Sequence, residues 1–170
     1  MNPLSDLLVH MEWADARIWT AALAVPALAH DAATRERLHH FHSTQWAYLQ
    51  VLMGRPLDIP DLATFADLGS VGHWARGFYR QLPALRATLV GSRLDQQVDF
   101  PWAEHIATVY GRVAAPATVG ECILQLALHT AHHRGQVAMT VRVAGGEPPT
   151  VDYIAWIWMG RPSPDWNGLD

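Results

Sequence analysis

The sequence predicts an all-α protein, an up-down four-helix bundle, and three observations support this prediction. Apolar residues recur at helical spacing in four long stretches of the chain. Proline and glycine residues stand at the breaks between these stretches. Half of the 170 residues are apolar, which is enough for a substantial core in one domain. We therefore expect residues 1–170 to form a single domain in which four helices pack side by side.

The first two helices are expected at about residues 3–25 and 31–53. In the first stretch the apolar residues follow one helical face, and Ser5 can cap the start. Pro26 ends this helix. The second stretch ends at Gly54, because glycine readily adopts the left-handed conformation that often follows the last helical turn.

The middle of the chain has a less regular pattern. Residues 55–69 have no sustained period, so we expect a loop that could form the rim of a cleft. A third helix is expected at about residues 70–90, with a kink or an early break at Pro83, which lacks a backbone donor. Residues 97–100 and 108–113 have short β character and predict a small hairpin before the last long helix.

The fourth long helix is expected from Thr118 to about Ala144. Thr118 and Glu121 form a capping-box pattern, in which each side chain binds the backbone N–H of the other residue. Beyond two glycines and two prolines, residues 151–159 predict a short extra C-terminal helix. The tail after Gly160 is expected to be an extended arm.

Charge and cysteine content limit the classes of function. The formal net charge is −4 and only 16% of the residues are charged, so neither nucleic acid nor an anionic membrane is an expected partner. The single cysteine, Cys122, excludes an intramolecular disulfide and suits a reducing compartment. It is expected to be a small core residue. No signal sequence or membrane span is recognisable, and we expect a cytoplasmic protein.

The stretch around His129 and His133 is the part of the sequence that predicts chemistry. Residues four apart on a helix lie one above the other about 6 Å apart, so two imidazoles can bind a single metal ion. Two stacked neutral histidines on an inward face also need partners for their ring nitrogens, and a metal ion supplies one. The alternative is that both are surface residues or hydrogen-bonded core residues.

A third ligand is expected from the second helix, which contains His39, His40 and His42. Helical periodicity alone leaves the choice among them open. His40 is favoured because it lies on the same face of the helix as small residues, which leave room beside a metal ion. These residues are Thr44, Ala47 and Val51.

Three segments resemble the DinB/YfiT-like superfamily. The run HTAHHRGQV at residues 129–137 is similar to the metal-site helix of that family. The segment LLVHMEWADAR at residues 7–17 is similar to its first helix, and GGEPPTVDY at residues 145–153 is similar to the turn after its metal helix. Together these matches extend from residue 7 to residue 153.

The resemblance implies a four-helix bundle with a three-histidine metal site. In the family, the histidine of the second helix lies about fourteen residues before a helix-ending glycine, so Gly54 points to His40. The implied metal ligands are therefore His40, His129 and His133. The first helix of the family often has Asn at the position of Asp15, which is a departure in this chain.

The resemblance also implies a class of reaction, because characterised relatives include transferases and isomerases that use low-molecular-weight thiols. Three imidazoles leave coordination positions open, which is typical of a catalytic site. We expect a divalent metal ion, zinc or nickel before iron or manganese, and a small-molecule substrate. The alternative is a non-catalytic metal-binding or stress-associated module. A homodimer is common in the resembling family and is expected here.

Further groups are expected around the metal. Gln125 and Gln136 lie on the same helical face as the two histidines, and Arg134 and the loop at residues 55–69 are further candidates. All are candidates to orient the ligands or to contact a substrate. Arg134 has an alternative role as a structural ion-pair partner.

Overall fold

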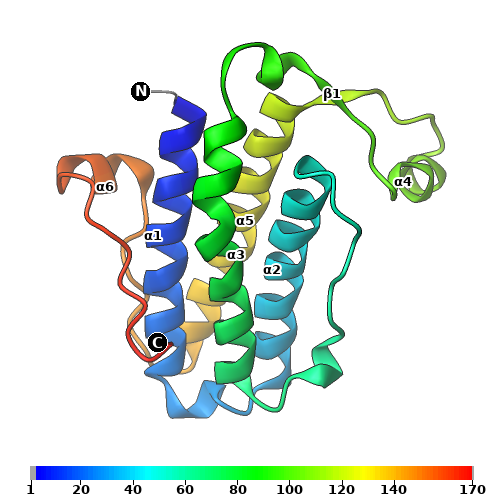
Figure 1. Ribbon diagram of the computed structural model, residues 1–170. Helices are drawn as coiled ribbons and strands as arrows, with labels where there is room; N and C mark the ends of the chain where they lie inside the picture. The colour runs from blue at the N-terminus through cyan, green and yellow to red at the C-terminus, as the bar shows by residue number, and fades with distance from the viewer. Residues whose placement is uncertain (1–2, 170) are drawn as a thin grey trace.

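The computed structural model describes residues 3–169 and contains four long helices packed side by side (Figure 1). These helices are α1 (Pro3–Leu23), α2 (Ala32–Leu52), α3 (Leu68–Thr88) and α5 (Val119–Val143). The short elements are η1 (Pro26–Leu28), η2 (Leu62–Thr64), η3 (Gly91–Asp95), β1 (Gln97–Val98), α4 (Ala103–Tyr110), β2 (Ala117–Thr118) and α6 (Tyr153–Trp158). The predicted all-α bundle is confirmed. None of the helices in residues 3–169 combines the length and apolarity that a membrane span requires.

The starts of the long helices follow the capping rules. Asp31 caps α2 by accepting a hydrogen bond from the Thr34 N–H at 2.7 Å, and Asp67 forms a capping box with Ser70 at the start of α3. The predicted capping box of α5 is present, with Thr118 and Glu121 each accepting from the other's backbone N–H. Side chains thereby satisfy backbone donors that a helix start leaves without partners.

The direction of the helices differs from simple up-down alternation between α2 and α3. In the view of Figure 1, α1 and α5 run downward, whereas α2 and α3 both run upward. Residues 53–67 run back along α2 and make this parallel arrangement possible. Arg35, near the start of α2, donates to the carbonyls of Leu62 and Phe65, at 3.2 and 2.9 Å. The predicted loop therefore lies against α2.

Helix α3 continues through Pro83, so the predicted early break is wrong. The neighbouring Leu82 and Leu85 are each 1% exposed. Their burial in the core stabilises the helix on both sides of the proline, which offsets the loss of one backbone hydrogen bond.

The segment between α3 and α5 forms only part of the predicted hairpin. Gln97 pairs with Thr118 and Val98 with Ala117, in an antiparallel ladder. The predicted second strand at residues 108–113 is wrong, because residues 103–110 form α4. Gly111, at φ 66°, ends this helix in the left-handed conformation. The strand that pairs with β1 is β2, which comes later in the chain. Local β propensity at Thr108 and Val109 was overridden by the helical turn that precedes them.

The C-terminal tail is not a free arm. Trp166 is 6% exposed and Leu169 1% exposed, and both belong to the main core. Gly72 of α3 provides the space, since a Cβ atom there would lie 2.6 Å from the Leu169 side chain. Arg76 donates to the Leu169 carbonyl at 2.7 Å. The tail therefore closes the bundle over α3.

A buried polar network joins the four long helices. Its centre is Asp15 of α1, which is fully buried and accepts from Arg134 of α5 at 2.7 Å. Gln45 of α2 donates to the same carboxylate at 2.8 Å, and the Tyr79 hydroxyl of α3 donates to it as well. Gln45 also contacts Thr130 of α5 at 3.2 Å. One carboxylate thus receives hydrogen bonds from three other helices.

The network continues to Trp19 through His42. The Trp19 indole N–H donates to His42 Nε2 at 2.8 Å. Burial lowers the pKa of His42 to about 4, so the ring is neutral at neutral pH and carries its proton on Nδ1. That N–H donates to Gln45 Oε1 at 2.7 Å. Both ring nitrogens of His42 are therefore used inside the core.

We predict that Arg134→Met destabilises the fold by about 3–5 kcal/mol, because it leaves the Asp15 carboxylate buried without its counter-charge. The matched control is Arg37→Met, which removes an exposed hydrogen bond to Thr140 at 2.9 Å and is expected to cost less than about 1 kcal/mol. Urea unfolding measures both changes. Equal losses in the two variants would show that the buried pair has no special role.

Candidate metal centre

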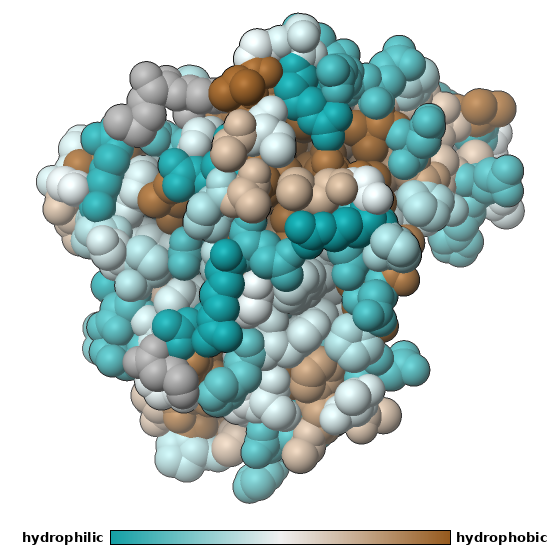
Figure 2. Space-filling view, viewed as in Figure 1, coloured by the Kyte–Doolittle hydropathy of each residue, from teal (hydrophilic) through white to brown (hydrophobic). Residues whose placement is uncertain are grey.

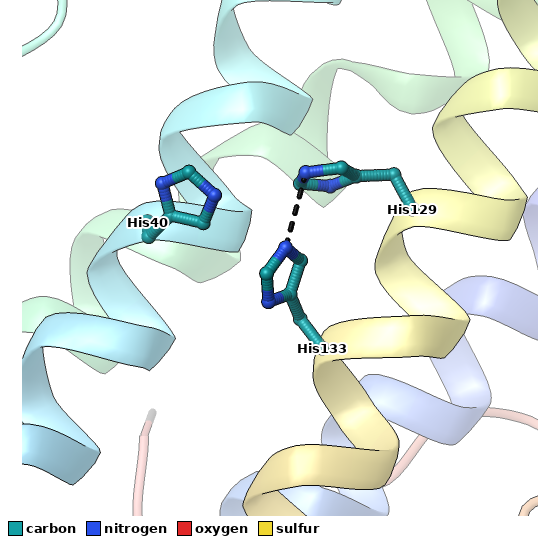
Figure 3. Close-up of side chains that lie close together, drawn as sticks. All are labelled: His40, His129 and His133. Atoms are coloured by element: carbon teal, nitrogen blue, oxygen red, sulfur yellow. Dashed lines mark hydrogen bonds between the residues drawn. The ribbon is translucent and has the colours of Figure 1, made fainter.

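The structure brings the three predicted ligands together. His129 and His133 lie one turn apart on α5 and face His40 of α2 (Figure 3). One ligand nitrogen from each ring lies within 4.8 Å of those of the other two. His129 Nε2 and His133 Nε2 are 3.1 Å apart. The ring centroid of His40 lies 4.7 Å from that of His133 and 5.5 Å from that of His129.

This geometry fits a divalent metal ion. Because metal–imidazole bonds are about 2.0–2.1 Å long, two nitrogens on one ion lie roughly 2.9–3.4 Å apart at common bond angles. The pair on α5 already has this spacing. His40 is exposed, so its side chain has room to turn toward the other two rings. These three residues, the histidine triad, could therefore hold a metal ion.

The protonation states also suit a metal ligand. Burial, together with the neighbouring His133 and His40 rings, lowers the pKa of His129 to about 4. The pKa of His133 is lowered chiefly by burial. Both imidazoles are therefore neutral at neutral pH and have a lone pair available. Within the described residues, His129 Nδ1 is buried without a hydrogen-bond partner, so protein groups satisfy this ring only in part.

Side-chain hydrogen bonds fix the orientation of His133. His133 Nδ1 donates to Gln136 Oε1 at 2.9 Å, which leaves the Nε2 lone pair directed at the triad. Gln136 in turn donates through Nε2 to His132 Nε2 at 3.0 Å. Gln136, one of the residues expected to orient a ligand or to contact a substrate, therefore bonds directly to His133. The contribution of His132 was missed, although its i, i+4 spacing to Gln136 was visible in the sequence.

The other histidines of α2 turn away from the triad. The alternative ligand His42 is wrong, because both of its ring nitrogens form hydrogen bonds in the core network. His39 Nε2 bonds to the Pro60 carbonyl at 2.9 Å, and its ring stacks on Trp74. Of the three neighbours, His40 faces α5.

Arg134 and Cys122 are both buried in the bundle. Arg134 is buried against Asp15, so its alternative role as an ion-pair partner is the one observed. Cys122 is 2% exposed within the core, as predicted, and burial raises the pKa of its thiol to about 11. The thiol is therefore protonated at neutral pH and is a poor nucleophile.

A cavity of about 440 Å³ opens beside the triad, and His40 and His129 form part of its wall. Gln125 lines it, and Ile59 brings in the loop at residues 55–69. Trp102, at the N-cap of α4, and Ile106 within α4 also line it. The sequence pattern did not predict this helix. The arrangement therefore places three metal-binding side chains at the wall of a space that can take a small molecule.

Comparison with known proteins supports the resemblance seen in the motifs. No curated protein matches the chain. The model of the DinB family matches residues 102–165, a segment that contains α4, α5 and α6 and therefore two of the three histidines. This match to residues 102–165 is consistent with the DinB/YfiT-like superfamily assignment made from the sequence motifs.

Proposed function

We propose that the protein binds one divalent metal ion through His40, His129 and His133 and acts as a metal-dependent enzyme on a small electrophilic molecule. The observation that supports this proposal is the convergence of three imidazoles from two helices, with ligand nitrogens within 4.8 Å of one another. The reaction is a transfer or isomerisation that uses a low-molecular-weight thiol, or a hydrolysis that uses water.

The donor set favours a catalytic site over a closed structural one. Within residues 3–169, no fourth His, Cys, Asp or Glu belongs to the group, whereas structural zinc sites have four protein ligands. When bound, the ion supplies a Lewis acid that lowers the pKa of a coordinating water or thiol. The cavity beside His40 and His129 gives a substrate access to the open positions.

The protein side chains position the reacting groups. Gln136 holds the His133 ring with Nε2 directed at the triad, and the half-buried His129 is kept neutral by its surroundings. Zinc and nickel suit three imidazoles best, while iron and manganese are alternatives. The choice of a thiol as cofactor rests on the family resemblance.

A second candidate function is a non-catalytic metal-binding module. The observation that favours it is that the three histidines connect α2 and α5, so a bound ion would cross-link two helices of the bundle. Assays of metal content and of turnover separate the two candidates.

The proposal includes a cytoplasmic location and a homodimer. The single cysteine is buried and reduced, which suits a reducing compartment. In α6, Trp156 is buried while Trp158 is 79% exposed, and an exposed tryptophan is typical of a contact with another subunit.

We predict that purified wild-type protein contains about one divalent metal ion per chain and that His40→Ala, His129→Ala and His133→Ala each lose most of it, because two imidazoles bind far more weakly than three. Elemental analysis measures the content. His73→Ala, which changes an exposed histidine of α3, is the matched control and should retain the metal. Equal metal content in all five proteins would disprove the site.

We further predict turnover by the metal-loaded protein in a panel of thiol-conjugation and hydrolysis reactions, and its loss by at least about 100-fold in His133→Ala. His132→Ala is a control that keeps all three ligands and should lose far less activity. If metal-loaded wild type shows no turnover that depends on His133, the enzyme function fails for these chemistries and the non-catalytic module is supported.

A further inference from the structure

The wall of the cavity beside the triad is aromatic and apolar. Tyr48 of α2 and Trp102 lie with ring centroids 5.8 Å apart. Phe100 packs against both, at 5.4 Å from Tyr48 and 4.9 Å from Trp102. Ala47 and Ile106 complete the apolar side. This cluster joins residues 99–116, an arm between β1 and β2 that contains α4, to the bundle.

The same wall lacks charge. Among the described residues that line the cavity, none is Asp, Glu, Lys or Arg. Ser43, Thr44 and Gln125 offer neutral hydrogen-bonding groups. A charged substituent in this space would lose hydration without an opposite charge from the protein, which is costly. The cavity therefore disfavours phosphorylated, carboxylated or ammonium-bearing molecules away from the triad.

The size of the cavity limits the ligand further. At about 440 Å³ it lies in the range of small-molecule pockets, about 300–1,000 Å³. Aromatic walls favour flat rings, which gain stacking and edge contacts in addition to burial of apolar area. A molecule with one or two rings matches both the volume and the wall.

The arm controls the shape of this space. Trp102 occupies the N-cap position of α4, and Ile106 follows one turn later on the same side. None of the residues of α4 is buried, and the helix stands away from the four long helices (Figure 1). Trp102 and Ile106 also border a second cavity of about 250 Å³ between α4 and the hairpin. They therefore form a partition between the two cavities.

We propose that the cavity binds an uncharged, largely apolar molecule with one or two rings, and that Trp102 and Ile106 determine this specificity. As the substrate of a metal-dependent reaction, the molecule would present its polar reactive group to the triad, and this role rests on the proposed function. The binding itself depends on the wall and requires no metal.

A second apolar groove is the competing place for such a molecule. It lies between α1 and α5, has a volume of about 370 Å³ and is lined in part by Leu124, Leu128 and Ala131. Arg134 and Asp152 also line it, so it is not free of charge. Figure 2, in the same view as Figure 1, shows hydrophobic residues gathered in the upper half of the molecule, so general apolar adsorption also needs a control.

The test uses two dyes with one skeleton. 5-(Dimethylamino)naphthalene-1-sulfonamide is neutral and has two fused rings, and 5-(dimethylamino)naphthalene-1-sulfonate has a charged sulfonate in place of the sulfonamide. Metal-free wild type should bind the neutral dye at one site with enhanced fluorescence, and the sulfonate at least about tenfold more weakly, a difference of about 1.4 kcal/mol. His133→Ala should bind the neutral dye like wild type, since His133 does not line the cavity.

Matched variants locate the site. Ala47→Phe fills the cavity and Trp102→Ala removes its aromatic wall, and each should weaken the neutral dye by at least about tenfold. Ala131→Phe fills the competing groove, and Trp158→Ala removes an exposed tryptophan elsewhere. Both variants should bind the neutral dye as tightly as wild type. Thermal unfolding confirms that the variants fold, and Trp102→Ala, in the exposed arm, remains informative if Ala47→Phe does not fold.

Two results would overturn the inference. One is equal affinity for the sulfonate and the neutral dye, and the other is loss of binding in Ala131→Phe instead of Ala47→Phe. If the protein binds no metal, the predicted dye binding should still be observed. If it binds metal but not the dyes in the predicted order, the proposed class of ligand is wrong and the metal site is unaffected.

Discussion

The buried ion pair between Asp15 and Arg134 is the interaction on which the candidate site depends. Arg134 follows His133 directly, so anchoring its guanidinium to α1 turns the preceding side chain toward α2. His42 has the corresponding role on α2, since its bonds to Trp19 and Gln45 leave His40, two residues earlier, on the opposite side facing α5. The network thus sets the rotation of both helices that supply ligands, before any metal is present.

The network also gives Asp15 of α1 a structural role. Arg134 is 4% exposed, and a buried guanidinium needs a counter-charge as well as hydrogen bonds. The carboxylate supplies both, and its remaining lone pairs accept from Gln45 and Tyr79. Such a fully bonded buried group specifies one arrangement of helices, because any slip of α5 would separate the charges.

The long helices and the ligand pair were predictable from local patterns. Helical period, the Thr118–Glu121 capping box and the i, i+4 spacing of His129 and His133 all act within a few residues. The parallel course of α2 and α3 was not predictable, because it depends on contacts of residues 53–67 with Arg35 and other side chains of α2. The choice between His40 and His42 also depended on a partner, Trp19, that lies on another helix. The cavity wall was missed for the same reason, since Tyr48 and Trp102 meet only in the fold.

The central claim is that this network directs three imidazoles at one divalent ion. X-ray absorption spectroscopy at the zinc edge of zinc-loaded protein tests it most directly, because the method counts imidazole ligands and separates nitrogen from sulfur. The account predicts three imidazoles at about 2.0–2.1 Å with the remaining positions taken by light atoms from solvent. A spectrum with fewer than three imidazoles, or with a sulfur ligand at about 2.3 Å, would contradict it.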